Sequence, residues 1–147
     1  MNRWRFLRLR ILVVLFLFAV SSGCGSGRST VTGRVAYEDG SPLEAGIVIG
    51  EATVDGKVVG VQGNITRDGT FSWGADQEGD GALPGNYRVV VMPVALGDSE
   101  LAEGKQPAVD GKFTHYDSSG LTFEVKPGKN VLNITVTRPK PRQQRRK

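Results

Sequence analysis

Hydrophobic and polar residues alternate along much of the chain between positions 31 and 136. The clearest runs are 121–125, where Leu, Phe and Val alternate with Thr and Glu, and 132–136, where Leu, Ile and Val alternate with Asn and Thr. A period of two is that of a β-strand with one buried face. Weaker runs near 31–37, 47–54, 57–61 and 71–73 predict further strands. The segment 87–94 is almost continuously apolar, which predicts a central strand covered on both faces and ending near Pro93.

Turn-forming pairs separate these runs. They are Asp39-Gly40, Asp55-Gly56, Asp68-Gly69, Pro84-Gly85 and Pro127-Gly128. Asp-Gly pairs supply the positive φ angles of tight turns, and Asp55-Gly56 predicts a two-residue hairpin. No segment has a helical period of useful length. The pattern therefore predicts an all-β domain, an antiparallel β-sandwich of about seven strands.

Two residues of the predicted strands have expected structural roles. Gly33 lies on the buried side of its strand, where a missing side chain permits a bulge or the close approach of another backbone. For Tyr87 we favour a simply packed core aromatic. The alternative is a corner tyrosine, whose hydroxyl binds a backbone group.

The N-terminal segment has the pattern of an export signal. Residues 1–10 are basic, 11–20 form an unbroken apolar run, and Ser21-Ser22-Gly23 follow. Ten apolar residues are too few to cross a bilayer, which takes about 20. A plain secretory signal cut near the same place is one interpretation. The small residues followed by Cys24 favour another, because they resemble the lipobox of bacterial lipoproteins, although Ser21 stands where leucine is usual.

The lipobox resemblance implies a specific modification of Cys24. It implies cleavage before Cys24, a diacylglycerol thioether on its sulfur, and often a third acyl chain, such as palmitate, on the freed amine. Two or three chains anchor a protein stably, whereas one holds only reversibly. Six residue steps separate Cys24 from Thr30, and each spans at most ~3.6 Å, so the first strand would start within roughly 20 Å of the lipid.

Charge is distributed unevenly along the chain. Its 147 residues, enough for one domain, include 19 basic and 15 acidic side chains, for a net charge of +4. Four arginines lie in 1–10 and six basic residues in 138–147; between them, nine basic and fifteen acidic residues leave a net charge of −6. This body lacks the basic face of a nucleic-acid-binding domain. The tail 138–147 has no apolar residues and is expected to be disordered. Its six positive charges could bind anionic polymers or lipid headgroups, and the alternative is a segment that only keeps the chain soluble.

Two clusters carry groups with possible chemistry. Asp76, Glu78 and Asp80 alternate as at the start of a calcium loop, but Tyr87 stands where the bidentate glutamate belongs, so we favour a solvated acidic loop and predict no metal or cofactor. His115 precedes Asp117 and two serines. Because the sequence lacks a nucleophile elbow, we favour a structural turn there and predict no enzyme activity.

Four segments, taken in order, resemble one family. They are VTGRVAYEDGSPLEAGIV (31–48), RDGTFSW (67–73), PGNYRVVV (84–91) and FEVKPGKNVLNITV (123–136). Together they resemble the carboxypeptidase regulatory-like, or transthyretin-like, domain, and in particular the small lipoproteins of planctomycete-type bacteria. The resemblance implies a Greek-key sandwich of transthyretin-like or immunoglobulin-like type and an exported location.

These observations predict a membrane-anchored lipoprotein of the cell envelope. Residues 1–23 form the signal peptide, 24–30 the lipidated cysteine and tether, 31–137 the sandwich and 138–147 the basic tail. The sandwich would be a non-catalytic interaction or structural module, meeting an envelope protein or polysaccharide through sheet edges or the loops 74–84 and 95–119. The alternative is an accessory carbohydrate- or peptide-binding module that assists secreted processing enzymes.

Overall fold

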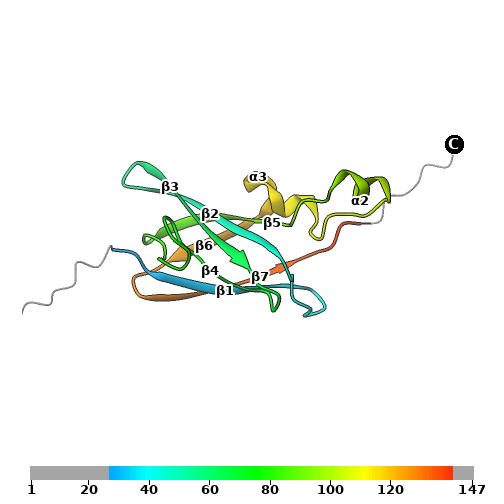
Figure 1. The fold of residues 1–147 in the computed structure, drawn as a ribbon. Helices are drawn as coiled ribbons and strands as arrows, with labels where there is room; N and C mark the ends of the chain where they lie inside the picture. The colour runs from blue at the N-terminus through cyan, green and yellow to red at the C-terminus, as the bar shows by residue number, and fades with distance from the viewer. Residues whose placement is uncertain (1–26, 141–147) are drawn as a thin grey trace, which may run out of the picture.

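Two β-sheets make up most of the structure, a computed structural model that describes residues 27–140. One sheet has the strand order β4-β1-β7 and the other β3-β2-β5-β6, and Figure 1 shows one sheet below the other. The strands are β1 (Thr30–Tyr37), β2 (Gly46–Val54), β3 (Lys57–Ile65), β4 (Thr70–Ser72), β5 (Gly85–Met92), β6 (Leu121–Val125) and β7 (Lys129–Val136). The predicted all-β class is confirmed.

The hairpin between β2 and β3 forms at the predicted turn. Asp55 and Gly56 have φ angles of 49° and 74°, as a type I′ turn requires at both central positions. Val54 pairs with Lys57 immediately beyond them. The local pair of turn residues therefore fixes the register of a hairpin whose two strands have nine residues each.

The first and last strands run parallel, so the expectation of a wholly antiparallel arrangement is wrong for this pair. Thr30 pairs with Lys129 and Tyr37 with Val136, in an unbroken ladder. β4 pairs with the other side of β1 in the antiparallel sense. Alternation reports only which face of a strand is buried, and not the direction of a partner about 100 residues away.

Side chains from both sheets meet in one buried cluster. Val31 and Val35 of β1 and Ile134 of β7 are buried in it together with Val48 of β2 and Val89 of β5. In β1 and β7 the face that the alternation predicts to be buried is the buried one. Residues outside the strands, among them Leu43, Val109 and Phe113, complete the cluster.

Gly33 allows the close packing of the three-stranded sheet. A Cβ atom at this position would lie 1.8 Å from the carbonyl oxygen of Leu132 and 2.9 Å from the Phe71 ring. No side chain fits there, so the predicted close backbone approach is confirmed. Gly33 pairs with Leu132 on one side and with Phe71 on the other.

Tyr87 both packs in the core and binds the backbone. Its side chain is buried, with its ring centroid 5.5 Å from that of the buried Trp73. Its hydroxyl donates a hydrogen bond to the Leu83 carbonyl oxygen at 3.0 Å. The structure therefore shows the corner-tyrosine alternative, which we did not favour from the sequence.

β5 is central, as its apolar run predicts, but its outer face is covered only at Val90, and Arg88 and Met92 on that face are exposed. It lies between β2 and β6 and ends at Met92, just before Pro93. Val90 points away from the core cluster and is still buried, because the segment after β5 folds back over the sheet. This segment contains three short helical turns where we expected loops: α2 (Asp98–Ala102), η1 (Gly111–Thr114) and α3 (Tyr116–Ser119). Turns of four or five residues are too short to produce a helical period.

Candidate functional site

The start of the described chain is fastened to one end of the domain, which we call the entry end. Ser29 exchanges backbone hydrogen bonds with Ala82, at 2.7 and 2.9 Å, and its hydroxyl accepts one from the Gly128 N–H at 3.1 Å. Residues 28–30, which the sequence places in the tether, therefore contact the folded body. Cys24, the predicted lipidation site, lies outside the described residues. Within residues 27–140, no helix is long and apolar enough to span a membrane.

The acidic loop at the entry end is organised by Asp80. Its carboxylate accepts backbone N–H groups of Ala75 at 2.7 Å and of Asp76 and Gln77 at 3.3 Å, and it pairs with the Arg28 guanidinium. Arg28 also pairs with Asp76 at 2.5 Å. Desolvation raises the pKa of Asp80, but the three N–H donors and Arg28 outweigh it and lower the pKa overall.

These contacts give two of the three predicted calcium ligands, Asp76 and Asp80, other partners. Asp80 is committed to the loop backbone, Asp76 to Arg28, and Glu78 is exposed. Among residues 27–140, no three His, Cys, Asp or Glu side chains are grouped as metal ligands would be. The loop geometry therefore matches a self-contained acidic turn.

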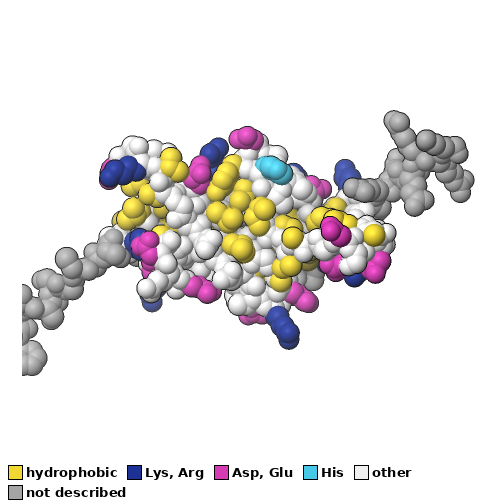
Figure 2. Space-filling view, turned by 45° about the horizontal axis from the view of Figure 1, so that its top comes forward, with side chains coloured by type: hydrophobic (Ala, Val, Ile, Leu, Met, Phe, Trp, Pro, Cys, Tyr) yellow, Lys and Arg dark blue, Asp and Glu magenta, His cyan; other side chains and the backbone are white. Residues whose placement is uncertain are grey.

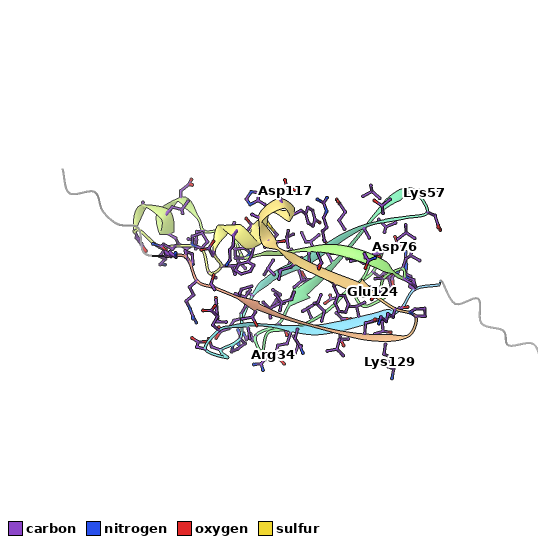
Figure 3. The ribbon with its side chains drawn as sticks, turned by 180° about the vertical axis from the view of Figure 1, so that it is seen from behind. Arg34, Lys57, Asp76, Asp117, Glu124 and Lys129 are labelled. Atoms are coloured by element: carbon purple, nitrogen blue, oxygen red, sulfur yellow. The ribbon has the colours of Figure 1, made fainter. Side chains whose placement is uncertain are left out.

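His115 and Asp117 lie close in sequence but have different partners. The His115 Nδ1 atom lies 2.8 Å from the Thr114 hydroxyl and 3.3 Å from the Gly111 carbonyl oxygen. The Asp117 side chain is 99% exposed and lies 3.7 Å from Arg88. Figure 3 shows Asp117 on the outer side of the helical segment. In the described part of the chain, these side chains do not form the linked base and acid of a catalytic triad.

The serines beside His115 also bind backbone groups. The Ser118 hydroxyl donates to the Lys112 carbonyl oxygen at 2.7 Å, and the Ser119 hydroxyl accepts the Leu121 N–H at 3.3 Å. Both bonds close the turns that lead from η1 into β6. Their geometry fits the structural role that we favour for this segment.

An apolar groove lies at the opposite end of the domain, the exit end, where β7 finishes. It has a volume of about 1140 Å³ and is lined by residues including Met92, Val94, Leu101, Val109 and Pro139. Val94 and Leu101 are 62% and 53% exposed. Figure 2 shows apolar side chains gathered over the middle of one face and beside the helical segment. The sequence gives no sign of this groove, because its apolar residues come from separate short segments.

A hollow lined by both polar and apolar groups lies over the outer face of the three-stranded sheet. It has a volume of about 480 Å³, and hydroxyl and amide side chains from four strands line part of it. They include Thr32 of β1, Asn64 of β3 and Asn133 of β7. The alternation places Thr32 and Asn133 on exposed faces, but it does not bring β1, β3 and β7 together.

The exit of the chain from β7 is also fastened. The Asp110 N–H donates to the Thr137 carbonyl oxygen at 2.8 Å. The Arg138 guanidinium stacks on the Tyr37 ring at 3.7 Å from its centroid and binds the Asp39 carboxylate at 3.0 Å. Residues 141–147 of the predicted basic tail lie outside the described part. No protein-family model, curated protein or solved structure matches this chain.

Proposed function

We propose that the chain is a cell-envelope lipoprotein anchored through Cys24. The observation that carries this proposal is the order of residues 1–24: a basic start, ten apolar residues, three small residues and a single cysteine. The fastening of Ser29 supports it, since only five residue steps then separate Cys24 from the folded body. At ~3.6 Å for each step, the domain lies within about 18 Å of the lipid.

Lipid labelling tests the anchor. A bacterial host expressing the full chain is fed radiolabelled palmitate, and the membrane fraction is then separated and analysed by mass spectrometry. We expect label and diacylglycerol mass on the peptide that begins at Cys24. The Cys24→Ser variant is the control and loses both. An unmodified thiol on wild-type protein, or wild-type protein released into the medium, contradicts the anchor.

The body, in our proposal, is a β-sandwich of transthyretin-like type that acts as a non-catalytic interaction module. The shared core cluster of the two sheets and the order of the four family-like segments support this assignment. The separate partners of His115 and Asp117 support the absence of catalysis. Screening of ester, peptide and glycoside substrates tests it, and any hydrolysis that disappears in a His115→Ala variant contradicts it.

An accessory carbohydrate-binding role is the second candidate, and the hydroxyl and amide side chains that line the hollow over the three-stranded sheet support it. Hydroxyl and amide groups can both donate to and accept from sugar hydroxyls. Titration of the soluble Cys24→Ser protein with neutral oligosaccharides, followed by NMR, distinguishes the two functions. Saturable shifts around Thr32 and Asn133 that vanish in an Asn133→Ala variant favour the accessory role. If millimolar sugar produces no NMR shifts, the result contradicts the accessory role and favours the interaction module.

A further inference from the structure

The apolar groove at the exit end is built from segments that are distant in sequence. Its lining comes from residues 92–96 at and after the end of β5, from α2 and the residues that follow it, from η1, and from Pro139 and Lys140 beyond β7. Figure 1 shows α2 at the same end of the domain as the end of β7. Val109 lines the groove and also belongs to the core cluster, so the groove lies directly against the core.

Hydrogen bonds hold the walls of this groove in place. The Tyr37 hydroxyl donates to the Ala108 carbonyl oxygen at 3.0 Å. The Glu100 carboxylate accepts the Gly97 N–H at 3.0 Å, and the Glu100 carbonyl oxygen accepts the Lys105 N–H at 3.0 Å. The groove is therefore part of the fold without any occupant, as most small-molecule sites are.

Uncovered aliphatic side chains gather in the groove. Of the five large apolar side chains that are exposed among residues 27–140, three line it: Met92, Val94 and Leu101. The other apolar residues of the lining are alanine, leucine, proline and valine, so the apolar part of the lining is aliphatic throughout. Its volume of about 1140 Å³ is slightly above the range of about 300–1,000 Å³ that is usual for small-molecule sites. A flexible hydrocarbon chain fits this lining.

The charged side chains of the lining are of one sign. Among the described residues, those that line the groove are Lys105 and Lys140, whereas the body between positions 28 and 137 has a net charge of −6. Lys105 also lies 3.3 Å from Glu100 and 3.5 Å from Glu103, but its side chain is 54% exposed. Such exposed pairs are weak, so the ammonium group can bind another anion.

We propose that the groove binds an aliphatic carboxylate of the fatty-acid class. The hydrocarbon chain lies along Met92, Val94 and Leu101, and the carboxylate lies at Lys105 and Lys140. The ligand is a free acid and not the acyl chains proposed at Cys24, because those chains are joined as esters or an amide and carry no charge for the lysines to bind. The inference goes beyond the proposed function and needs neither the anchor nor a sugar.

Titration with three ligands of equal chain length tests the charge preference. The chain from Gly25, which keeps all of the described residues, is titrated at neutral pH with decanoate, 1-decanol and decylammonium. Calorimetry measures affinity, and NMR of the Val94 and Leu101 methyl groups locates the site. We expect decanoate to bind about three- to tenfold more tightly than 1-decanol, and decylammonium to bind most weakly. Dodecanoate should bind about tenfold more tightly than decanoate, because it buries two more methylene groups.

Two pairs of matched variants test the residues. Val94→Asp places a carboxylate in the groove and should weaken decanoate binding at least tenfold, whereas Val58→Asp, at a position that is 70% exposed in β3, should not change it. Urea unfolding checks that both variants fold. Lys105→Gln combined with Lys140→Gln should abolish the preference for decanoate over 1-decanol. The control, Lys57→Gln combined with Lys129→Gln, should keep it.

Several results overturn the proposal. Equal affinity for decanoate and 1-decanol in the wild-type chain shows a groove for uncharged acyl chains, such as those proposed at Cys24. Tighter binding of decylammonium, or equal losses in Val94→Asp and Val58→Asp, shows that the lysines or the groove are not the site. A dimer in sedimentation velocity that Val94→Asp dissociates assigns the groove to a second copy of this chain.

Discussion

Gly33→Ala is the sharpest test of the packing between β1 and β7. The new Cβ atom would lie 1.8 Å from the Leu132 carbonyl oxygen, whereas a carbon–oxygen contact is normally about 3.3 Å. The strands must therefore separate by roughly 1.5 Å, which takes neighbouring ladder hydrogen bonds out of range. Two such bonds contribute about 1 kcal/mol each and overpacking costs about 1–3 kcal/mol, so we expect a loss of about 3–5 kcal/mol.

Urea unfolding of a form beginning at Gly25 measures this loss. Trp73 is then the single tryptophan, and because it is fully buried its fluorescence reports the core. For a domain of this size, the same loss lowers the Tm by roughly 10–25 °C. Gly60→Ala is the matched control: Gly60 is also in a strand, and the nearest heavy atom to its added Cβ is 4.0 Å away. If Gly33→Ala is no more destabilising than Gly60→Ala, the β1–β7 packing described above is incorrect.

Three further predictions follow from individual side chains. Tyr87→Phe removes the hydroxyl bond to Leu83 and should reduce the free energy of unfolding by about 1 kcal/mol in the same urea titration. Tyr116→Phe is the control, because the Tyr116 hydroxyl bonds to no residue among 27–140, and it should change the free energy of unfolding by less than about 0.5 kcal/mol. The Thr66 and Thr70 hydroxyls bind Asp68 and lower its pKa to about 2 from 3.8. The ionised Asp68 carboxylate therefore stabilises the fold above about pH 4, and this contribution is lost as the pH falls to about 2. In an Asp68→Asn variant, the midpoint of urea unfolding should depend less on pH over this range. Because Asp80 is committed to the loop, millimolar Ca²⁺ should leave the Tm unchanged, and a Ca²⁺-dependent rise that Asp80→Asn abolishes would restore the metal site.

Local features of the fold were predictable because their causes are local. Asp55-Gly56 fixes a hairpin through two positive φ angles, and the alternation in β6 and β7 reports which face is buried. Gly33 was identified from its register alone, since a glycine on a buried face implies a close neighbour. Each of these inferences needs only residues within one strand or turn.

Features that join distant segments were not predictable from the pattern. The parallel pairing of β1 and β7 joins residues about 100 positions apart, and no periodicity specifies its direction. The pairing of Arg28 with the loop at Asp80 spans 52 positions. Met92 and Leu101 line the apolar groove only because the segment after β5 folds back over the sheet. The candidate surfaces are therefore products of topology, whereas the predicted anchor depends on local sequence alone.

That topology determines which surfaces a chain anchored at Cys24 presents to its surroundings. The chain joins the domain beside Ser29, where Arg28 pairs with Asp76 and Asp80 and the acidic loop is closed by its own hydrogen bonds. The exit end carries both the apolar groove and the first residue of the basic tail. Had β7 run antiparallel to β1, Arg138 would instead lie at the same end of the domain as Ser29. Because the two strands are parallel, the groove and Arg138 lie together at the end of the domain opposite to Ser29.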